Sequence, residues 1–410
     1  MSQEHAFDMI NAGHSCFITG PGGVGKTYVI QNSLNNHSIL CAPTGIAALH
    51  VGGETCHSVF GLPFNVPEPE DQRRLGYKLK QLFSNGAIKT IQFDEIGMVR
   101  ADMFDLMDKK MRFLTRKNVP FGGLQILAFG DFFQLAPVLT SNDKYAFNSL
   151  GYKSPYCFDS HVWQELDLKP IALKKVYRQS DETQVKMLNM IRTGAPGAVK
   201  LIQQFNRLKG SPTDPDILTL CCYNDTANMI NGHWYDQIDS KEHVFHAKKT
   251  GKMPADPVDE VLKLKEGTKV LLCANTDMYK NGSRGIIVGF HHDYISVVLE
   301  NGSVVAVEKY TWENKESEVF QGEVNSVRVG AFTQYPIKLG WAITVHKSQG
   351  MTLDAACLDV GRGCFTPGQL YVALSRLKDL KNLTVSTDLV PSDLMVSERV
   401  KEYYSENLLL

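Results

Sequence analysis

Eight consecutive residues near the start of the chain have the types and spacing of a phosphate-binding loop. They read Gly20-Pro21-Gly22-Gly23-Val24-Gly25-Lys26-Thr27 and match the pattern G-x-x-x-x-G-K-[ST]. In such a loop, backbone N–H groups turn inward around phosphate oxygens, and the following helix adds the positive end of its dipole. Lys26 is expected to reach the β- and γ-phosphates, and the Thr27 hydroxyl to ligate Mg²⁺. The pattern therefore predicts a site for a nucleoside triphosphate such as ATP.

Two polar segments further along the chain could complete hydrolytic chemistry at this site. Asp94 follows a strand-like run and is expected to hold Mg²⁺ through its water shell, while Glu95 orients or deprotonates the attacking water. Gln134 follows the next strand and can hydrogen-bond both the γ-phosphate and that water. Alone, the acidic pair would be a solvated strand end and the glutamine a loop-capping amide. Downstream of a phosphate loop, these residues indicate hydrolysis.

The elements that must position these residues are those of a parallel α/β sheet. Apolar strands alternate with amphipathic helices from residue 1 to about 165, and strands are expected at 16–19, 38–42, 89–93 and 124–129. Polar residues follow each of them. Ligands in open α/β sheets bind outside the carboxyl ends of the strands. Four such ends predict one shared site, with Gly20, Gly22, Gly23, Val24, Gly25, Lys26, Thr27 and Tyr28 holding the nucleotide.

Composition excludes several classes of protein. The 410 residues carry a formal net charge of −1, so a nucleic-acid site would have to be a local basic groove. No apolar run approaches the ~20 residues of a membrane span, and the first residues lack the features of a signal peptide. The nine cysteines form no C-x-x-C pair and read as small core residues. We therefore expect a protein of a reducing, cytoplasmic compartment.

The pattern also predicts how the chain divides. Residues 1–165 form the first α/β domain, with a short excursion at 60–88 that is a candidate strand-separating wedge. Residues 166–285 and 335–410 form a second α/β domain. Between them, residues 286–334 alternate like short strands and contain an Asn301-Gly302 turn. We expect a small β-barrel inserted into the second domain.

In this order, the elements resemble the motif set of superfamily 1 helicases, and most closely the PIF (petite integration frequency) group, which is related to RecD and the phage helicase Dda. The similarity runs from Gln3 to about Val385. The matching blocks are 41–58 (Ia), 93–99 (II), 130–135 (III), 176–179 (IV), 345–352 (V) and 371–377 (VI), with an extra helical segment at 182–208. The resemblance implies two RecA-like phosphate-loop NTPase domains with parallel sheets and an inserted SH3-like β-barrel.

The resemblance also implies roles for residues far from the phosphate loop. Gln3 would read the adenine edge, Gly350 would contact the nucleotide, and Arg178 and Arg376 would act as arginine fingers. The alternative for each arginine is a surface salt bridge. Nucleic acid would be bound by Pro43, Thr44, Gly45, His57, Ser58, Phe60, His346, Lys347, Ser348 and Thr352. Phe60, Phe64 and Trp341 are available for base stacking, although each could equally be a core residue, and for any one of them the core is the favoured alternative.

The function implied is an ATP-dependent DNA helicase that uses Mg²⁺ and moves 5′-to-3′ as a monomeric motor on single-stranded and forked DNA. RNA is an alternative substrate, because motifs that read the backbone do not separate DNA from RNA strongly. Two other classes are open. One is a phosphate-loop kinase or signalling NTPase, which would need no motif V or VI. The other is an ATPase that clamps or remodels nucleic acid without unwinding it. A nearly bare motor core favours a bacterial or phage source.

Overall fold

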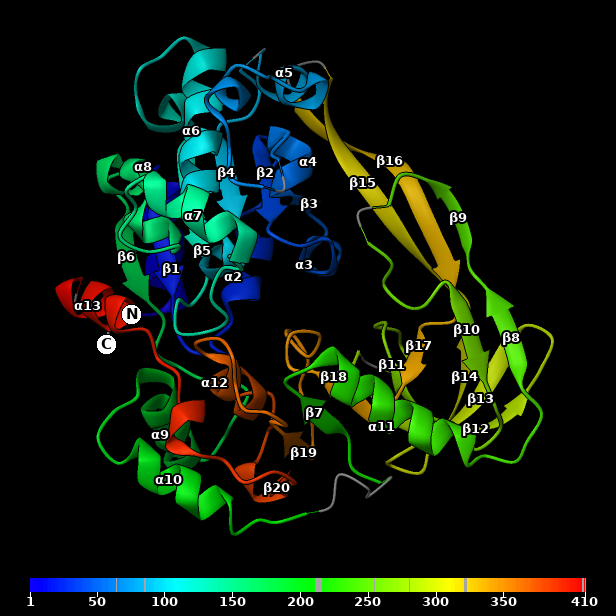
Figure 1. Ribbon diagram of the computed structural model, residues 1–410. Helices are drawn as coiled ribbons and strands as arrows, with labels where there is room; N and C mark the ends of the chain where they lie inside the picture. Colours follow the sequence, from blue (N-terminus) through cyan, green and yellow to red (C-terminus); the bar gives the residue numbers. More distant parts are fainter. Residues whose placement is uncertain are drawn as a thin grey trace. The chain divides into compact units, whose positions relative to one another are not determined.

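The computed structural model describes the chain as two units. The description covers residues 1–410 except 64, 85, 140, 211–215, 254, 280, 321–322, 408 and 410, and the side chains of 69, 141–142, 315–320 and 323–326. Unit 1 consists of Met1–Tyr177, Asn314–Val329 and Ser397–Leu410, and unit 2 of Arg178–Glu313 and Gly330–Val396 (Figure 1). Within the described residues, no helix is both long enough and apolar enough to cross a membrane.

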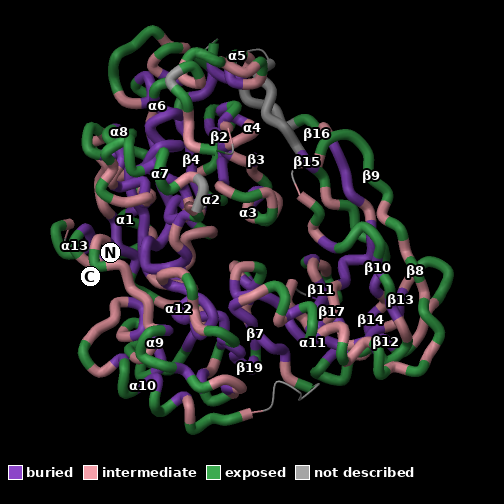
Figure 2. Tube along the Cα trace, in the orientation of Figure 1, coloured by how far each residue is buried: buried purple, intermediate pink, exposed green. Residues whose placement is uncertain are grey.

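Unit 1 is built on one six-stranded sheet in which every pair of neighbours is parallel. The order is β3 (Glu54–Thr55), β2 (Ser38–Ala42), β4 (Thr90–Phe93), β5 (Gln125–Phe129), β1 (Cys16–Thr19) and β6 (Lys169–Ala172). The four strands expected from the sequence are all present. They are buried along nearly their whole length, as strands covered on both faces should be (Figure 2).

Helices of unit 1 alternate with these strands. They are α1 (Gln3–Asn11), α2 (Lys26–Ser33), α3 (Gly45–Val51), α4 (Cys56–Phe60), α5 (Tyr77–Phe83), α6 (Ala101–Thr115), α7 (Ser141–Ser149), α8 (His161–Glu165) and α13 (Glu398–Glu406). The unit also has 3₁₀ turns η1 (Pro69–Gln72), η2 (Ile96–Met98), η3 (Pro120–Gly123) and η4 (Cys157–Asp159).

The observed boundaries of unit 1 differ from the expected end at residue 165. Strand β6 pairs with β1 along Cys16–Thr19 and completes the first sheet, although its sequence reads equally well as the first strand of a new domain. Residues 397–410 also belong to unit 1, through helix α13, instead of continuing the second domain. Local sequence pattern finds strands and helices, but it does not say which sheet a strand joins.

Unit 2 contains a second parallel sheet, as predicted. Its strands are β18 (Ala342–Thr344), β7 (Thr219–Cys221), β19 (Ala356–Asp359) and β20 (Leu383–Val385), in that order. Its helices are α9 (Glu182–Thr193), α10 (Ala198–Phe205), α11 (Asn224–Asp236) and α12 (Gln369–Leu374), with 3₁₀ turns η5 (Leu380–Asn382) and η6 (Pro391–Asp393). The extra helical segment expected at 182–208 is therefore α9 and α10.

The remainder of the β structure is antiparallel. A five-stranded sheet has the order β14 (Val304–Glu308), β13 (Tyr294–Leu299), β12 (Arg284–Phe290), β11 (Lys269–Leu272) and β17 (Ile337–Leu339), and its apolar side chains share one core. Strands β8 (His243–His246) and β10 (Val261–Leu264) form a pair, and β15 (Tyr310–Phe320), β16 (Glu323–Gln334) and β9 (Lys248–Gly251) form a third sheet. The predicted change to antiparallel β structure is confirmed, but β8 to β11 and β17 lie outside the expected limits of 286–334.

The excursion at 60–88 is anchored by one buried lysine. Lys110, on α6, is fully buried, and its Nζ donates hydrogen bonds to the carbonyl oxygens of Gly61 and Arg74, each at 2.8 Å. Burial lowers the pKa of this ammonium group, so the two carbonyls replace part of the hydration it has lost. The lysine therefore ties both ends of the segment 61–74 to the long helix.

We predict that Lys110→Met lowers the free energy of unfolding by about 1–3 kcal/mol, because two carbonyl groups lose their donor. Urea unfolding measures this loss, and limited proteolysis should show faster cleavage within 61–76. The control is Lys109→Met, since Lys109 is the adjacent exposed lysine of the same helix. Equal stability of the two variants would contradict this anchoring role.

Candidate nucleotide site and nucleic-acid interface

The phosphate loop joins β1 to α2, as the sequence predicted. Gly20, Gly23 and Gly25 have positive φ angles of 147°, 83° and 83°. A Cβ atom on Gly20 would lie 2.4 Å from the carbonyl oxygen of Leu173, so only glycine allows the end of β6 to approach the loop this closely. Lys26 lies at the first position of α2, and its Nζ donates to the carbonyl oxygens of Gly20 at 2.8 Å and Pro21 at 3.2 Å. The ammonium group is thus held over the loop.

A pocket of about 370 Å³ lies beside the loop. It is lined by residues of α1, the loop and the segment after β6, including Gln3, Phe7, Val24, Tyr28 and Tyr177. The Gln3 side-chain amide donates to the carbonyl oxygens of Val24 at 3.2 Å and Gly25 at 3.5 Å. The Tyr28 ring meets Phe7 edge to face at 6.3 Å. Aromatic walls and a fixed amide suit the flat, polar edge of a nucleobase.

The remaining predicted loop residues also lie at this site. The carbonyl oxygen of Gly23 accepts a hydrogen bond from the Tyr177 amide at 2.8 Å, which ties the loop to the last residue of the first stretch of unit 1. Val24 is buried in the core of unit 1. Gly22 and Thr27 are half-buried, and Thr27 follows Lys26 in the first turn of α2.

The carboxyl ends of β4 and β5 carry the acidic pair and the glutamine. Asp94 is 9% exposed, and burial together with the neighbouring Glu95 raises the pKa of its carboxyl group to about 7. Glu95 has left-handed backbone angles (φ 47°, ψ 44°), an uncommon conformation for a residue with a side chain. Its amide donates to Asp94 Oδ1 at 2.9 Å. A divalent cation would favour the ionised form of this buried carboxyl group.

Gln134 follows β5 in a tight turn. The backbone amide of Gln134 donates to the carbonyl oxygen of Asp131 at 2.9 Å, and the Gln134 side chain is buried. The Asp131 carboxylate accepts from the Phe133 amide at 3.2 Å, so the turn is fixed from within. Because β1, β4 and β5 are parallel strands of one sheet, the phosphate loop, the acidic pair and this turn share one edge.

Both predicted arginine fingers belong to unit 2, where Arg376 is buried and Arg178 is half-buried. Arg178 Nε donates to Thr352 Oγ1 at 3.1 Å, and its Nη1 to the Ser375 carbonyl at 2.9 Å. Burial lowers the pKa of its guanidinium group. Arg376 Nε donates to the Val372 carbonyl at 3.0 Å, and its Nη2 to Ser375 Oγ at 2.9 Å. Both guanidinium groups are thus positioned by α12 and the turn after it, and neither is a surface arginine.

The predicted nucleic-acid residues of unit 1 lie around α3 and α4. Thr44 is exposed and caps α3, since its hydroxyl accepts from the Ala47 amide at 3.2 Å, and Pro43 and Gly45 on either side are half-buried. His57 and Ser58 are half-buried residues of α4. Burial and the nearby Arg100 lower the pKa of the His57 imidazole. His57 is therefore neutral at physiological pH and offers a hydrogen bond instead of a positive charge.

Phe60 is a core residue, which is the alternative that the sequence favoured for each of these aromatic residues, and so its inclusion among the residues that bind nucleic acid is wrong. Its side chain is fully buried and stacks on Phe83 at 6.3 Å and on Phe93 at 6.2 Å. Trp341 is likewise buried in a core with residues of α11. The sequence cannot show which face of a short helix an aromatic residue occupies, and here the core takes both rings. Phe64 lies outside the described residues.

In motif V the predicted contacts divide into exposed and buried groups. Lys347 is exposed, and His346 is half-buried. Ser348 is fully buried and its Oγ donates to the Val345 carbonyl at 2.8 Å, so the prediction that it contacts nucleic acid is wrong. The hydroxyl of Thr352 accepts from Arg178, which makes it a partner of the arginine. Gly350 is exposed and has a φ of 79°.

An exposed aromatic residue beside motif V was missed from the sequence. Phe365 is 51% exposed, and its ring stacks on the His346 imidazole with centroids 5.9 Å apart and an angle of 12°. Tyr223 meets the same phenylalanine at 5.2 Å, and the Arg362 guanidinium lies 4.5 Å from the Tyr223 ring. Burial lowers the pKa of His346. A neutral imidazole, two aromatic rings and an arginine plane form a surface suited to stacked bases.

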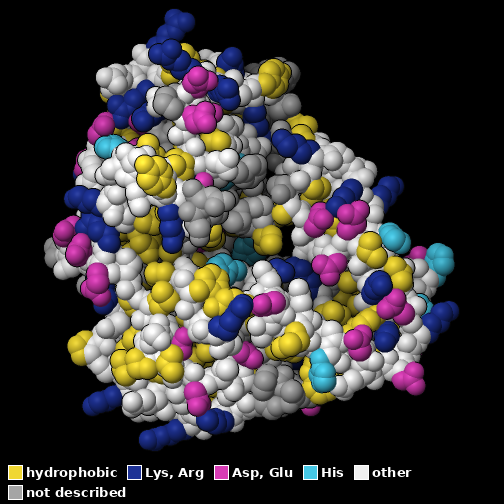
Figure 3. Space-filling view, viewed as in Figure 1, with side chains coloured by type: hydrophobic (Ala, Val, Ile, Leu, Met, Phe, Trp, Pro, Cys, Tyr) yellow, Lys and Arg dark blue, Asp and Glu magenta, His cyan; other side chains and the backbone are white. Residues whose placement is uncertain are grey.

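Charge is not concentrated in one strongly basic face in the view of Figure 3. Lysine and arginine side chains are scattered there among aspartate and glutamate side chains, as a net charge of −1 implies. Binding of a polyanion would therefore depend on local groups such as Lys347, on backbone amides and on stacking.

Each unit contains a parallel α/β sheet, and unit 1 carries a phosphate loop. These features define the class of the protein as a RecA-like phosphate-loop NTPase. Residues 1–194 match the model of the PIF1-like helicase family. The chain is 30% identical to the ATP-dependent DNA helicase Pif1 of Campylobacter jejuni, over 98% of this chain and 97% of that protein. It is also 30% identical to human ATP-dependent DNA helicase PIF1, over 96% of this chain and 61% of that protein. The chain belongs to the PIF1-like helicase family.

Solved structures give the same result. Pif1 from Bacteroides sp in complex with ADP-AlF4 matches with a TM-score of 0.89 and 29% identity, covering 98% of this chain and 96% of that one. Bacteroides Pif1 bound to ssDNA matches with a TM-score of 0.70 and 30% identity over the same shares of the two chains. The present chain spans less than two thirds of the length of the vertebrate relatives, from 61% to 64%.

We predict that the His346 imidazole titrates below the ordinary value of 6.5, because burial disfavours its charged form. The unfolded chain binds this proton more readily, so His346 lowers stability as the pH falls from about 6.5 towards its lower folded pKa, and the loss is complete below that folded pKa. Measurement is by NMR of the imidazole resonances, with His346→Gln to assign the signal. A midpoint at or above 6.5 would show that the imidazole is charged and pairs with an anionic group.

Proposed function

We propose that the protein is an ATP-driven DNA helicase that moves 5′-to-3′ on a single strand. The observation that carries this proposal is the convergence of Lys26, the Asp94-Glu95 pair and Gln134 at one sheet edge of unit 1, in a chain of the PIF1-like helicase family. The similarity to a Bacteroides Pif1 bound to ssDNA supports DNA as the substrate. The proposal includes Mg²⁺ as the metal, a monomeric motor and a preference for DNA over RNA.

The residues at the loop fit ATP and Mg²⁺. The positive φ angles of the loop glycines are typical of a backbone whose amides turn towards a bound anion, and the Lys26 ammonium group is held at the same loop. Asp94 is a buried carboxyl group with a raised pKa, and a bound cation would lower that pKa again. Thr27 and Asp94 would hold Mg²⁺, which when bound offsets the negative charge of the phosphate oxygens. Glu95 then takes the proton of the attacking water, and Gln134 orients that water.

The remaining parts of the proposed mechanism are charge stabilisation by the two arginines and binding of the DNA strand. Arg178 and Arg376 are proposed to stabilise charge that develops on the transferred phosphoryl group. Their bonds to Ser375 and Val372 hold them in fixed directions, which lowers the cost of ordering them for catalysis. The His346–Phe365 pair is proposed to stack a base of the bound strand. Unwinding by a wedge within residues 60–88 also stays part of the proposal.

The decisive experiment measures ATP hydrolysis with single-stranded DNA, RNA or no nucleic acid, followed by unwinding of tailed duplexes. We expect stimulation by single-stranded DNA, and unwinding of a duplex with a 5′ tail but not of one with a 3′ tail. Lys26→Ala is the control: it should lower hydrolysis at least about 10²–10³-fold, because one phosphate-stabilising donor is lost, while single-strand binding is retained.

Other outcomes of this experiment would indicate a different class of function. Stimulated hydrolysis without unwinding of either duplex would indicate a clamp or remodelling ATPase. Hydrolysis indifferent to nucleic acid would indicate a signalling NTPase or kinase. Loss of strand binding in folded Lys26→Ala would show that the phosphate loop itself contacts DNA.

We predict that Phe365→Ala weakens binding of single-stranded DNA by about 1–3 kcal/mol, the worth of one stacked base. Phe365→Trp should restore binding because it keeps an aromatic face. Fluorescence anisotropy with a labelled oligonucleotide measures the change. The matched control is Phe113→Ala, since Phe113 is a similarly exposed phenylalanine (54%) on α6 of unit 1. Unchanged affinity for single-stranded DNA in Phe365→Ala would contradict the stacking role of Phe365. It would not affect the proposed binding of ATP at the phosphate loop.

A further inference from the structure

A tyrosine close to the carboxyl end of the chain contacts the nucleotide site of unit 1 from inside the core. Tyr404, on α13, is fully buried. Its hydroxyl lies 2.6 Å from Oγ1 of Thr19, which is the last residue of β1 and directly precedes Gly20 of the phosphate loop. The same hydroxyl lies 3.1 Å from the amide of Phe132 and 3.2 Å from Oδ1 of Asp131, in the turn that carries Gln134.

The hydrogen bonds around this hydroxyl form a single ordered network. The Tyr404 hydroxyl has one proton, which it donates to Asp131 Oδ1. Its oxygen accepts from the Phe132 amide, and the remaining contact requires the Thr19 hydroxyl to donate to it. Each of these three contacts then has a defined direction, and buried networks of this kind resist displacement of any member. One oxygen atom fixes the end of β1 against the turn after β5.

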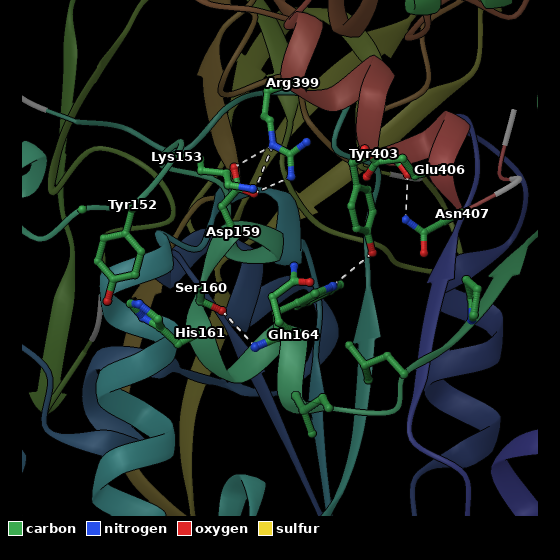
Figure 4. Close-up of a pocket in the computed structure, with 15 residues that line it drawn as sticks. Tyr152, Lys153, Asp159, Ser160, His161, Gln164, Arg399, Tyr403, Glu406 and Asn407 are labelled. Atoms are coloured by element: carbon green, nitrogen blue, oxygen red, sulfur yellow. Dashed lines mark hydrogen bonds and ion pairs between the residues drawn. The ribbon is translucent and has the colours of Figure 1, made fainter.

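The helix itself is held by contacts that do not involve Tyr404. Arg399 donates to both oxygens of Asp159, with a shortest distance of 2.7 Å, as drawn in Figure 4. The Tyr403 ring stacks on Phe158 with centroids 4.3 Å apart, and its hydroxyl accepts from Trp163 Nε1 at 3.0 Å. Asp159, Trp163, Arg399 and Tyr403 border a pocket of about 510 Å³. Helix α13 would therefore keep its position without the Tyr404 hydroxyl.

We propose that Tyr404 is a positioning residue for ATP hydrolysis. Its hydroxyl sets the distance between the start of the phosphate loop, where the Gly20 carbonyl also receives Lys26, and the turn that presents Gln134. This inference rests on the proposed ATPase activity. Tyr404 is not one of the residues that line the nucleotide pocket, and it is proposed to act through Thr19 and Asp131. Small displacements of reacting groups are costly, since a shift of about 1 Å can lower a rate 10²-fold.

The test compares Tyr404→Phe with Tyr403→Phe, because each removes one buried hydroxyl from the same helix. In Tyr404→Phe we expect kcat for ATP to fall about ten-fold or more, with a smaller change in KM, since the lost alignment matters most in the transition state. In Tyr403→Phe we expect kcat within about two-fold of the unmodified protein, although Trp163 loses its acceptor and stability falls by a similar amount in both variants. Binding of single-stranded DNA should be unchanged in both.

The Thr19 single variants keep the test valid if Tyr404→Phe folds poorly, and a double-mutant cycle adds to it where both single variants fold. Thr19→Val removes the other hydroxyl of the 2.6 Å contact and should lower kcat as Tyr404→Phe does, whereas Thr19→Ser should restore it. The double variant Thr19→Val with Tyr404→Phe should lose no more than the worse single variant.

Two results would overturn the proposal. One is a kcat for Tyr404→Phe no lower than that for Tyr403→Phe. The other is additive losses in the Thr19 and Tyr404 cycle. Absence of hydrolysis in the unmodified protein would instead contradict the proposed ATPase activity, so the two failures are distinguishable.

Discussion

The nucleotide site depends on the pairing of β1 with β5 on one side and β6 on the other. This register brings the end of β1 level with the ends of its neighbours, so the phosphate loop, the turn with Gln134 and the residue Leu173 meet at one edge. The strand is buried over all four residues, and Phe17 within it packs on Phe132 at 5.1 Å and on Trp163 at 5.4 Å. A loop that must hold a polyphosphate in a fixed shape needs such a rigid base, because flexible donors would have to be ordered on binding.

Burial also decides which groups of this protein can carry charge. It raises the pKa of Asp94 to about 7 and lowers the pKa of both His57 and His346, so the histidines become neutral partners. Positive charge for phosphate recognition must then come from lysines and arginines, which remain charged, and from backbone amides. Phosphate contacts hold a strand without reading its sequence, whereas stacking on neutral rings tolerates every base. The combination suits the proposed function, in which a strand of any sequence is bound and released.

The sequence predicted the local parts of the site well and the non-local parts poorly. The phosphate loop and the acidic pair are contiguous motifs whose chemistry follows from residue type, and four strands of the first sheet follow from apolar runs. Burial of Ser348 could not be read this way, because residue type does not show which side of a short element faces the core. Phe365 was missed for the opposite reason, since a lone exposed phenylalanine has no pattern. Strand β6 was assigned to the wrong sheet because strand order is a tertiary property.

The contact between Thr19 and Tyr404 shows why such non-local parts matter physically. These residues are separated by 385 positions, and all of unit 2 lies between them in the sequence. Closing so long a loop is entropically costly, although the cost grows only slowly with length. The hydroxyl network of Asp131, Thr19 and Tyr404 therefore cannot form from the first 177 residues alone. Those residues contain the phosphate loop and its strands, but the turn that carries Gln134 gains its buried partner only when the chain returns through α13. Unit 1 thus needs α13, which follows unit 2 in the sequence, to complete the hydrogen-bond network at this turn.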